Sequence, residues 1–166
     1  MNEKAAPTFH IRPATPEDVP LVLAFVRELA EYERLSHLVS ATEERLRESL
    51  FGERPGAEVL LGFAGDTPAG FAVYFHNFST FLGVRGLWLE DLYVRPALRR
   101  HGYGRTLLLH VARIARSRGC GRLEWAALDW NEPALRFYKS LGAVAQDDWT
   151  IFRVTGPALE KLADMH

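Results

Sequence analysis

The sequence has little of what would build a disulfide framework, a metal cluster or a membrane span. Its 166 residues contain a single cysteine, Cys120, which excludes an intramolecular disulfide and a multi-cysteine zinc site. The six histidines are scattered without ligand spacing, so we expect no metal. No apolar run approaches the roughly 20 residues of a membrane helix, and residues 1–10 lack the apolar core of a signal peptide. These absences predict a cytoplasmic protein with no membrane partner.

An excess of one charge is also missing overall, although charge is concentrated locally. The formal net charge of -1 gives no field over the whole protein that would hold nucleic acid. Residues 17–58 carry ten acidic side chains and five arginines, whereas residues 95–122 carry eight arginines and no acid. This division predicts an anion bound on one side and a cation on the other, and solvated helix faces are the simpler alternative.

Hydrophobic periodicity predicts a single α/β domain over residues 8–164, with a mixed sheet and helices on both faces. The expected strands are residues 9–12, 59–64, 70–78, 86–94, 122–128 and 148–154. The expected helices are residues 15–32, 42–50, 105–117, 131–141 and 157–163.

The loop between strand 86–94 and helix 105–117 is rich in arginine and glycine. Glycines such as Gly102 and Gly104 let the backbone approach a ligand closely, and the amides of a helix N-terminus attract an anion. Flanking guanidinium groups add charge-assisted hydrogen bonds to phosphate oxygens. The loop therefore predicts a diphosphate site, with a glycine-rich turn and solvated arginines as the alternative. It is neither a Walker A loop nor a dinucleotide fingerprint, since Leu107 stands where a third glycine belongs.

Two motifs in this order, Arg99-x-x-Gly102-x-Gly104 and the segment NEPALRFYKSLGA at 131–143, resemble the GNAT superfamily of acyl-CoA-dependent N-acetyltransferases. The segments ELAEYE, FGERP, LEDLYV and WNEP are similar to the spermidine/spermine (diamine) acetyltransferase branch. The resemblance extends from about Ile11 to Leu162. It implies a GNAT fold with splayed central strands, an acetyltransferase activity, acetyl-CoA as co-substrate and a homodimer.

The resemblance also implies where acetyl-CoA binds. The pantetheine arm would lie between the splayed strands and pair with the backbone of Leu92 and Val94, while Asn131 and Ala134 would contact it. The diphosphate would rest on the loop and the first turn of the helix. The residues expected there are Arg99, Arg100, His101, Gly102, Tyr103, Gly104 and Arg105.

Two residues match the family's proton-transfer groups. Tyr138 matches the tyrosine that protonates the departing sulfur, and a phenol of pKa about 10 can donate to a thiolate whose acid has a pKa near 8.5. Its helical spacing from Ala134 also fits an ordinary core residue. Glu90 matches the branch's proposed base. Because a carboxylate is a weak base for an ammonium of pKa about 10.4, we expect Glu90 to act through water or with a raised pKa.

The positions that match the amine pocket combine acidic and aromatic side chains, which suit a cation. Asp91 adjoins Glu90 and points to the opposite face of a regular strand unless a bulge intervenes. The spacing at 146–149 departs from the family pattern, so Asp148 is an alternative to Asp147. The full set is Tyr32, Glu33, Asp91, Glu124, Trp125, Asp147 and Trp149.

These expectations describe an enzyme in which an amine attacks acetyl-CoA directly within a ternary complex. The expected acceptor is a primary amine of a small polycation (a polyamine or diamine) or of a lysine-like amino acid of the thialysine type. Two alternatives stay open, namely a protein or peptide N-acetyltransferase and a non-catalytic CoA-binding sensor. A nucleic-acid site in the arginine block is disfavoured because aromatic residues do not interleave with the arginines.

Overall fold

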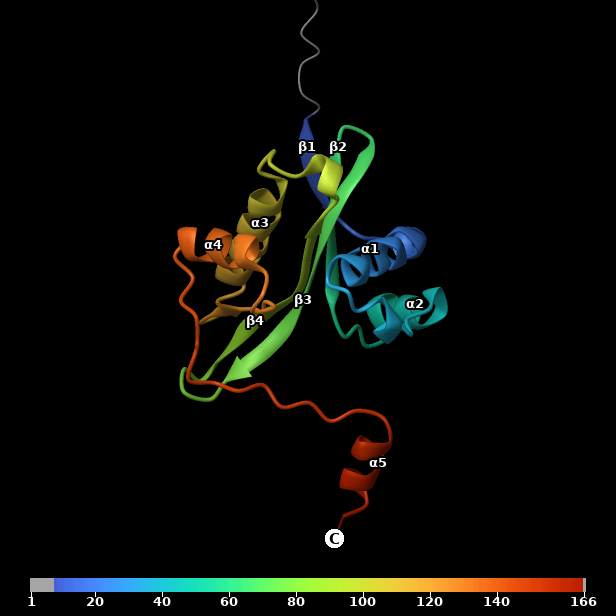
Figure 1. Cartoon of the computed structure of the whole chain (residues 1–166), viewed down its shortest axis with the longest axis vertical. Helices are drawn as coiled ribbons and strands as arrows, with labels where there is room; N and C mark the ends of the chain where they lie inside the picture. The colour runs from blue at the N-terminus through green and yellow to red at the C-terminus, as the bar shows by residue number, and fades with distance from the viewer. Residues whose placement is uncertain (1–7, 166) are drawn as a thin grey trace, which may run out of the picture. The chain divides into compact units, whose positions relative to one another are not determined.

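The chain has a mixed α/β architecture, as expected. A computed structural model describes residues 8–165, which form two compact units divided after Ala126. The first unit holds the sheet and three α-helices, and the second holds two further helices (Figure 1). Among residues 8–165, no helix combines the length and apolar character needed to cross a membrane.

The sheet is an antiparallel meander with one parallel strand added at its edge. Its spatial order follows the chain from β1 to β5, and β5 runs parallel to β4. The tight turns before β3 and β4 use Gly65 and Gly83 at φ values of 60° and 68°, which glycine adopts without steric cost. The strands are β1 Phe9–Pro13, β2 Glu58–Ala64, β3 Thr67–Ser79, β4 Val84–Val94 and β5 Leu123–Glu124.

Helices cover both faces of this sheet (Figure 1). Helices α1, Val19–Tyr32, and α2, Glu43–Phe51, lie on one side, and α3, Tyr103–Ser117, lies on the other. On the α1 side, Phe25 is fully buried against Phe71. Burying an aromatic or branched aliphatic side chain contributes about 1.5–3 kcal/mol, so this contact fixes α1 to the sheet. Three short 3₁₀ turns complete the unit, at Pro16–Asp18, Ser36–Leu38 and Pro96–Leu98.

The second unit contains α4, Glu132–Ser140, and α5, Pro157–Ala163. Asn131 caps α4 by accepting a hydrogen bond from the Ala134 amide at 3.4 Å. The expected helices are thus confirmed here, but the strand expected at 148–154 is wrong. Alternating apolar residues are present, yet Ile151 and Phe152 are 69% and 89% exposed, and a strand exists only where a neighbouring strand pairs with it.

The strand expected at residues 122–128 is confirmed only at Leu123 and Glu124, which pair with β4, and its expected length is wrong. Helix α3 also begins two residues earlier than expected, at Tyr103. The earlier start of α3 shortens the arginine-rich loop, and β5 ends opposite Trp88, well before the end of β4; both differences affect the site described below.

An ion pair anchors β1 to the start of α1. Arg12 donates to both carboxylate oxygens of Asp18, at 2.6 and 2.8 Å, and the Thr15 amide donates to the same group at 2.8 Å. The Arg12 hydrogen bonds lower the pKa of Asp18 to about 2. Because the ordinary Asp pKa is about 3.9, this stabilisation is fully present above pH 4 and is lost as the pH falls through about 2.

We expect Asp18→Asn to lower the free energy of unfolding by about 2 kcal/mol at pH 7 and by about half as much at pH 3. Urea unfolding at the two pH values measures this difference. Glu53→Gln, a change at an exposed position after α2, is the control. An equal loss at both pH values would show that the ionised form of Asp18 gains nothing from Arg12.

Candidate functional site

The edge of the sheet opens between β4 and β5. The two strands pair at Leu87–Leu123 and Trp88–Glu124, and the recorded pairing ends there. Strand β4 continues for six more residues to Val94. Its backbone beyond Trp88 therefore runs past the end of β5, which is the divergence expected of splayed central strands.

A β-bulge interrupts β4 at the point of divergence. Val73 of β3 pairs with Asp91, but the next residue, Tyr74, pairs with Leu89, so Glu90 is the extra residue. A bulge of this kind changes the alternation of side chains along the strand. Tyr93 contacts Phe25 of α1, which places Tyr93 and Asp91 on the α1 face. The register places Trp88 on that face as well, and its indole Nε1 donates to Glu90 Oε2 at 2.8 Å.

The bulge therefore removes the objection that two adjacent carboxylates cannot share one side of a strand. Burial, with Glu90 and Glu33 nearby, raises the pKa of Asp91 to about 7. Glu33 follows the last residue of α1, and burial raises its pKa as well. Three of the predicted carboxylates thus gather beside β4, and one of them titrates near neutral pH.

Glu124 lies on the same face and is held by two donors. Asn77 Nδ2 donates to Glu124 Oε2 at 2.9 Å, and Arg122 Nε lies 2.7 Å from the same oxygen. Asn77 reaches β5 from β3 because its partner across β4 is Gly86, where a Cβ atom would lie 2.3 Å from Asn77 Oδ1. A side chain at position 86 would break this connection between the strands.

The predicted diphosphate loop has the backbone that an anion site needs. Gly102 and Arg100 both adopt positive φ, at 80° and 67°, and turn the chain so that α3 begins at Tyr103. The first-turn amides of an α-helix have no partner within the helix, so those of Tyr103, Gly104 and Arg105 can serve a ligand. The ring of Tyr103 is buried and stacks on Phe9 at 4.1 Å between centroids, which anchors the helix start.

His101 and Arg99 have roles inside this loop. The His101 Nδ1 atom lies 2.9 Å from the Arg99 carbonyl oxygen. The Arg99 Nε donates to the Val94 carbonyl at 2.8 Å, and its guanidinium lies over the Tyr32 ring at 4.4 Å. Arg99 thereby connects a backbone group predicted to bind pantetheine with an aromatic ring predicted to bind the amine. Leu92 is half-buried on β4, and Trp125 follows β5.

The other predicted residues lie in the second unit. Tyr138 is half-buried on α4, with its ring 5.2 Å from that of Phe137. Asp147, the alternative Asp148, and Trp149 lie in the segment without regular structure, where Trp149 is 74% exposed. Asn131 and Ala134 form the N-cap contact of α4 described above.

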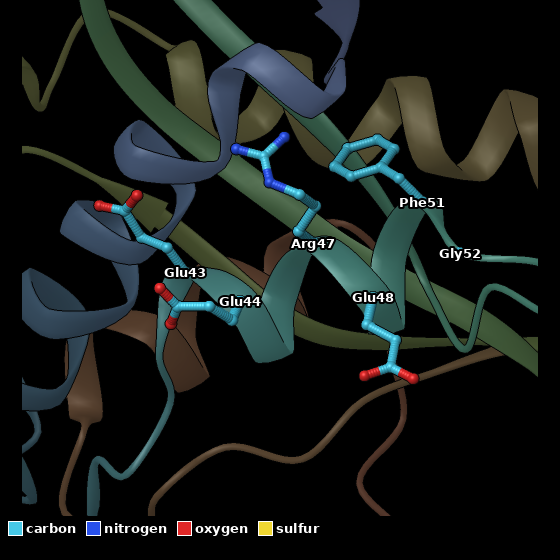
Figure 2. A pocket seen from close by; sticks show the side chains of 6 residues that line it. All are labelled: Glu43, Glu44, Arg47, Glu48, Phe51 and Gly52. Atoms are coloured by element: carbon cyan, nitrogen blue, oxygen red, sulfur yellow. The ribbon is translucent and has the colours of Figure 1, made fainter.

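Two hollows in the first unit contain none of the predicted residues. One, of about 460 Å³, opens on α2, and Figure 2 shows the carboxylates of Glu43, Glu44 and Glu48 directed away from the helix around it. The other, of about 320 Å³, lies among the end of α2, β2, β3 and α3 and includes the paired side chains of Glu58 and Arg118. Within residues 8–165, no group of three or more His, Cys, Asp or Glu side chains could hold a metal ion.

Two residues of the site were not found from the sequence. Trp88 precedes Glu90 by two positions, so strand alternation was a usable signal for their contact. Asn77 had no usable signal, because its partner Glu124 is 47 residues away along the chain.

Known proteins resemble this chain over most of its length. Residues 24–143 match the sequence model of the acetyltransferase (GNAT) family. A thialysine N-epsilon-acetyltransferase of Caenorhabditis elegans is 38% identical over 159 residues, which cover 94% of this chain and 98% of that protein. An L-ornithine N5-acetyltransferase of Arabidopsis thaliana is 32% identical, with 96% of this chain and 92% of that protein covered.

A solved structure shares the fold. An integron cassette protein from the mobile metagenome of V. cholerae superposes with a TM-score of 0.79 and 31% identity, covering 95% of this chain and 98% of that one.

Proposed function

This chain belongs to the GNAT family of acetyltransferases, and from that premise we propose that it transfers the acetyl group of acetyl-CoA to the side-chain amine of a lysine-like or ornithine-like amino acid. The observation that carries this proposal is the carboxylate cluster of Glu33, Glu90 and Asp91 beside the divergence of β4 and β5. A group of negative charges suits an acceptor that arrives as an ammonium ion.

Acetyl-CoA is the acyl donor of GNAT acetyltransferases, and we propose that it binds along the free part of β4. The backbone of Leu92 and Val94 would receive the pantetheine arm, with Asn131 and Ala134 of α4 contributing to the same arm. The amides of residues 102–105 would hold the diphosphate, and the guanidiniums of Arg100 and Arg105 would add charge-assisted hydrogen bonds. The left-handed turn at Arg100 and Gly102 supports this arrangement.

The proposed reaction is a direct transfer. An alkylammonium of pKa about 10.4 is less than about 0.1% neutral at pH 7, so Glu90 takes one proton from it, through water, and passes that proton to solvent. The neutral nitrogen then attacks the thioester carbon and the carbon–sulfur bond breaks. The thiolate takes a proton from Tyr138, and the second proton lost by the nitrogen restores the phenol.

The amine pocket is proposed to include Tyr32, Glu124 and Trp125 in addition to the carboxylate cluster. Asp147, or Asp148, and Trp149 are proposed as its wall. Diamines and polyamines are the second candidate substrates, favoured by the carboxylate cluster, which offers more than one anionic group to a substrate with more than one cationic centre.

A panel of acceptors tests this proposal. We expect thialysine, lysine and ornithine to release free thiol from acetyl-CoA with kcat/KM at least about 10-fold above that of a lysine-containing peptide. Putrescine and spermidine distinguish the second candidate. Preference for the peptide would replace the proposal with protein acetylation, and no release with any amine would favour the CoA-binding sensor.

We further propose that residues 8–164 act as one functional domain, that two copies form a homodimer, and that the enzyme works in the cytoplasm. The family match supports the single domain, because residues 24–143 extend across the division at Ala126. The exposed apolar side chains of Trp149, Ile151 and Phe152 support a partner copy that covers them. A lone thiol such as Cys120 suits a reducing compartment.

A further inference from the structure

The side chain of Glu90, the extra residue of the bulge, accepts a hydrogen bond from Trp88. Trp88 lies on the last recorded pair between β4 and β5, two residues before Glu90. In a regular strand, residues at positions i and i+2 stand about 7 Å apart on one face. Trp88 and Glu90 have this spacing, and the indole Nε1 donates to Glu90 Oε2 at 2.8 Å beside the bulge.

The surroundings of Glu90 are otherwise acidic. Asp91 is its neighbour on β4, and Glu33 approaches from the end of α1. Glu124 of β5 lies in register with Trp88, but its charge is already offset by Arg122 and by the Asn77 amide. A neutral indole N–H offers the Glu90 carboxylate a hydrogen bond without bringing a cation that would repel the ammonium substrate.

The donor also restricts the orientation of the carboxylate. An ionised carboxylate has about four acceptor positions on two oxygens, and Trp88 uses one of them. The others can accept from water or from an amine. Trp88 therefore fixes which acceptor positions of the Glu90 carboxylate remain open to an incoming amine.

We propose that Trp88 is a positioning residue for proton removal, whose indole N–H orients the Glu90 carboxylate toward the incoming ammonium. The inference rests on the proposed function, because it takes Glu90 as the proton acceptor. Trp88 itself touches neither substrate nor the reacting atoms.

Three variants test the inference through the rate. Trp88→Phe keeps an aromatic ring and deletes the N–H, and we expect kcat at pH 7 to fall about 10-fold with the KM of acetyl-CoA unchanged. The acid limb of the kcat profile moves to higher pH, since the ionised carboxylate has lost a donor. Glu90→Gln lowers kcat further, and adding Trp88→Phe to Glu90→Gln changes kcat by less than about two-fold because the proton acceptor that Trp88 orients is already lost.

A spectroscopic measurement needs no substrate and no Trp88 variant. In the wild-type enzyme, the ¹H–¹⁵N resonance of the Trp88 indole, assigned sequentially, should lie further downfield in ¹H than in Glu90→Ala, because a hydrogen bond to a carboxylate deshields the donor proton. Glu90→Ala deletes the acceptor and leaves Trp88 in place. This keeps the inference testable if Trp88→Phe fails to fold.

The outcomes separate the two claims. If Glu90→Gln is impaired while Trp88→Phe keeps the wild-type kcat and acid limb, the positioning role of Trp88 is wrong and the proposed function stands. If Glu90→Gln keeps the wild-type kcat, Glu90 is not the proton acceptor, and the role of Trp88 fails with it. Indole resonances that coincide in the wild type and in Glu90→Ala would also overturn the contact.

Discussion

Tyr138→Phe is expected to lower kcat by about 100-fold or more while changing the Kd of acetyl-CoA by less than about two-fold. The substitution deletes one hydroxyl and keeps the ring of a half-buried residue on α4. If that hydroxyl protonates the departing thiolate, its loss leaves a poor leaving group in the transition state. Because the proton moves only during the reaction, binding of the ground state should not change.

The measurement combines steady-state release of thiol with calorimetric titration of acetyl-CoA. Arg136→Lys is the matched control on the same helix, because Arg136 is exposed and makes only a 3.5 Å ion pair with Glu132. If Tyr138→Phe has the same turnover as the control, Tyr138 takes no part in the mechanism and is an ordinary packing residue of α4. Equal losses of turnover and affinity would instead indicate that α4 had been disturbed.

Local sequence signals predicted most of the sheet and the loop, because both depend on short-range chemistry. The turn residues Gly65 and Gly83 set the hairpins, and left-handed turns at Arg100 and Gly102 end the arginine-rich segment where α3 begins. Asn131 caps α4 where an N-cap residue was expected.

Features that depend on pairing between distant segments could not be read from the chain. Residues 148–154 alternate like a strand, but alternation alone does not supply the neighbouring strand with which they would have to pair. Residues 125–128 lie beyond the point where β5 leaves β4. The bulge at Glu90 arises from the register between β3 and β4, so only the paired strands reveal that Glu90 and Asp91 share a face. The sequence named both carboxylates, but their common side required the structure.

The same bulge gives Asp91 a distinctive dependence on pH. Burial, together with Glu90 and Glu33, raises its pKa to about 7, whereas an Asp in the unfolded chain titrates near 3.9. Between these values the folded protein holds a proton that the unfolded chain has released. The stability from protonated Asp91 is therefore fully present below pH 4, is lost as the pH rises through about 7, and stays absent above it.

In the wild type, the free energy of unfolding should fall by about 3 kcal/mol from pH 5 to pH 8, and Asp91→Asn should abolish this fall. Urea unfolding of the variant and the wild type at both pH values measures the difference, with Glu17→Gln as the control for a carboxylate outside the site.

Activity should follow the same titration of Asp91. Ionised Asp91 attracts the ammonium substrate, so kcat/KM for the amine should rise through pH 7 in the wild type and lose that step in Asp91→Asn. A step that persists in the variant would belong to another group, and a wild-type stability independent of pH over this range would mean that Asp91 is not held as a buried carboxyl.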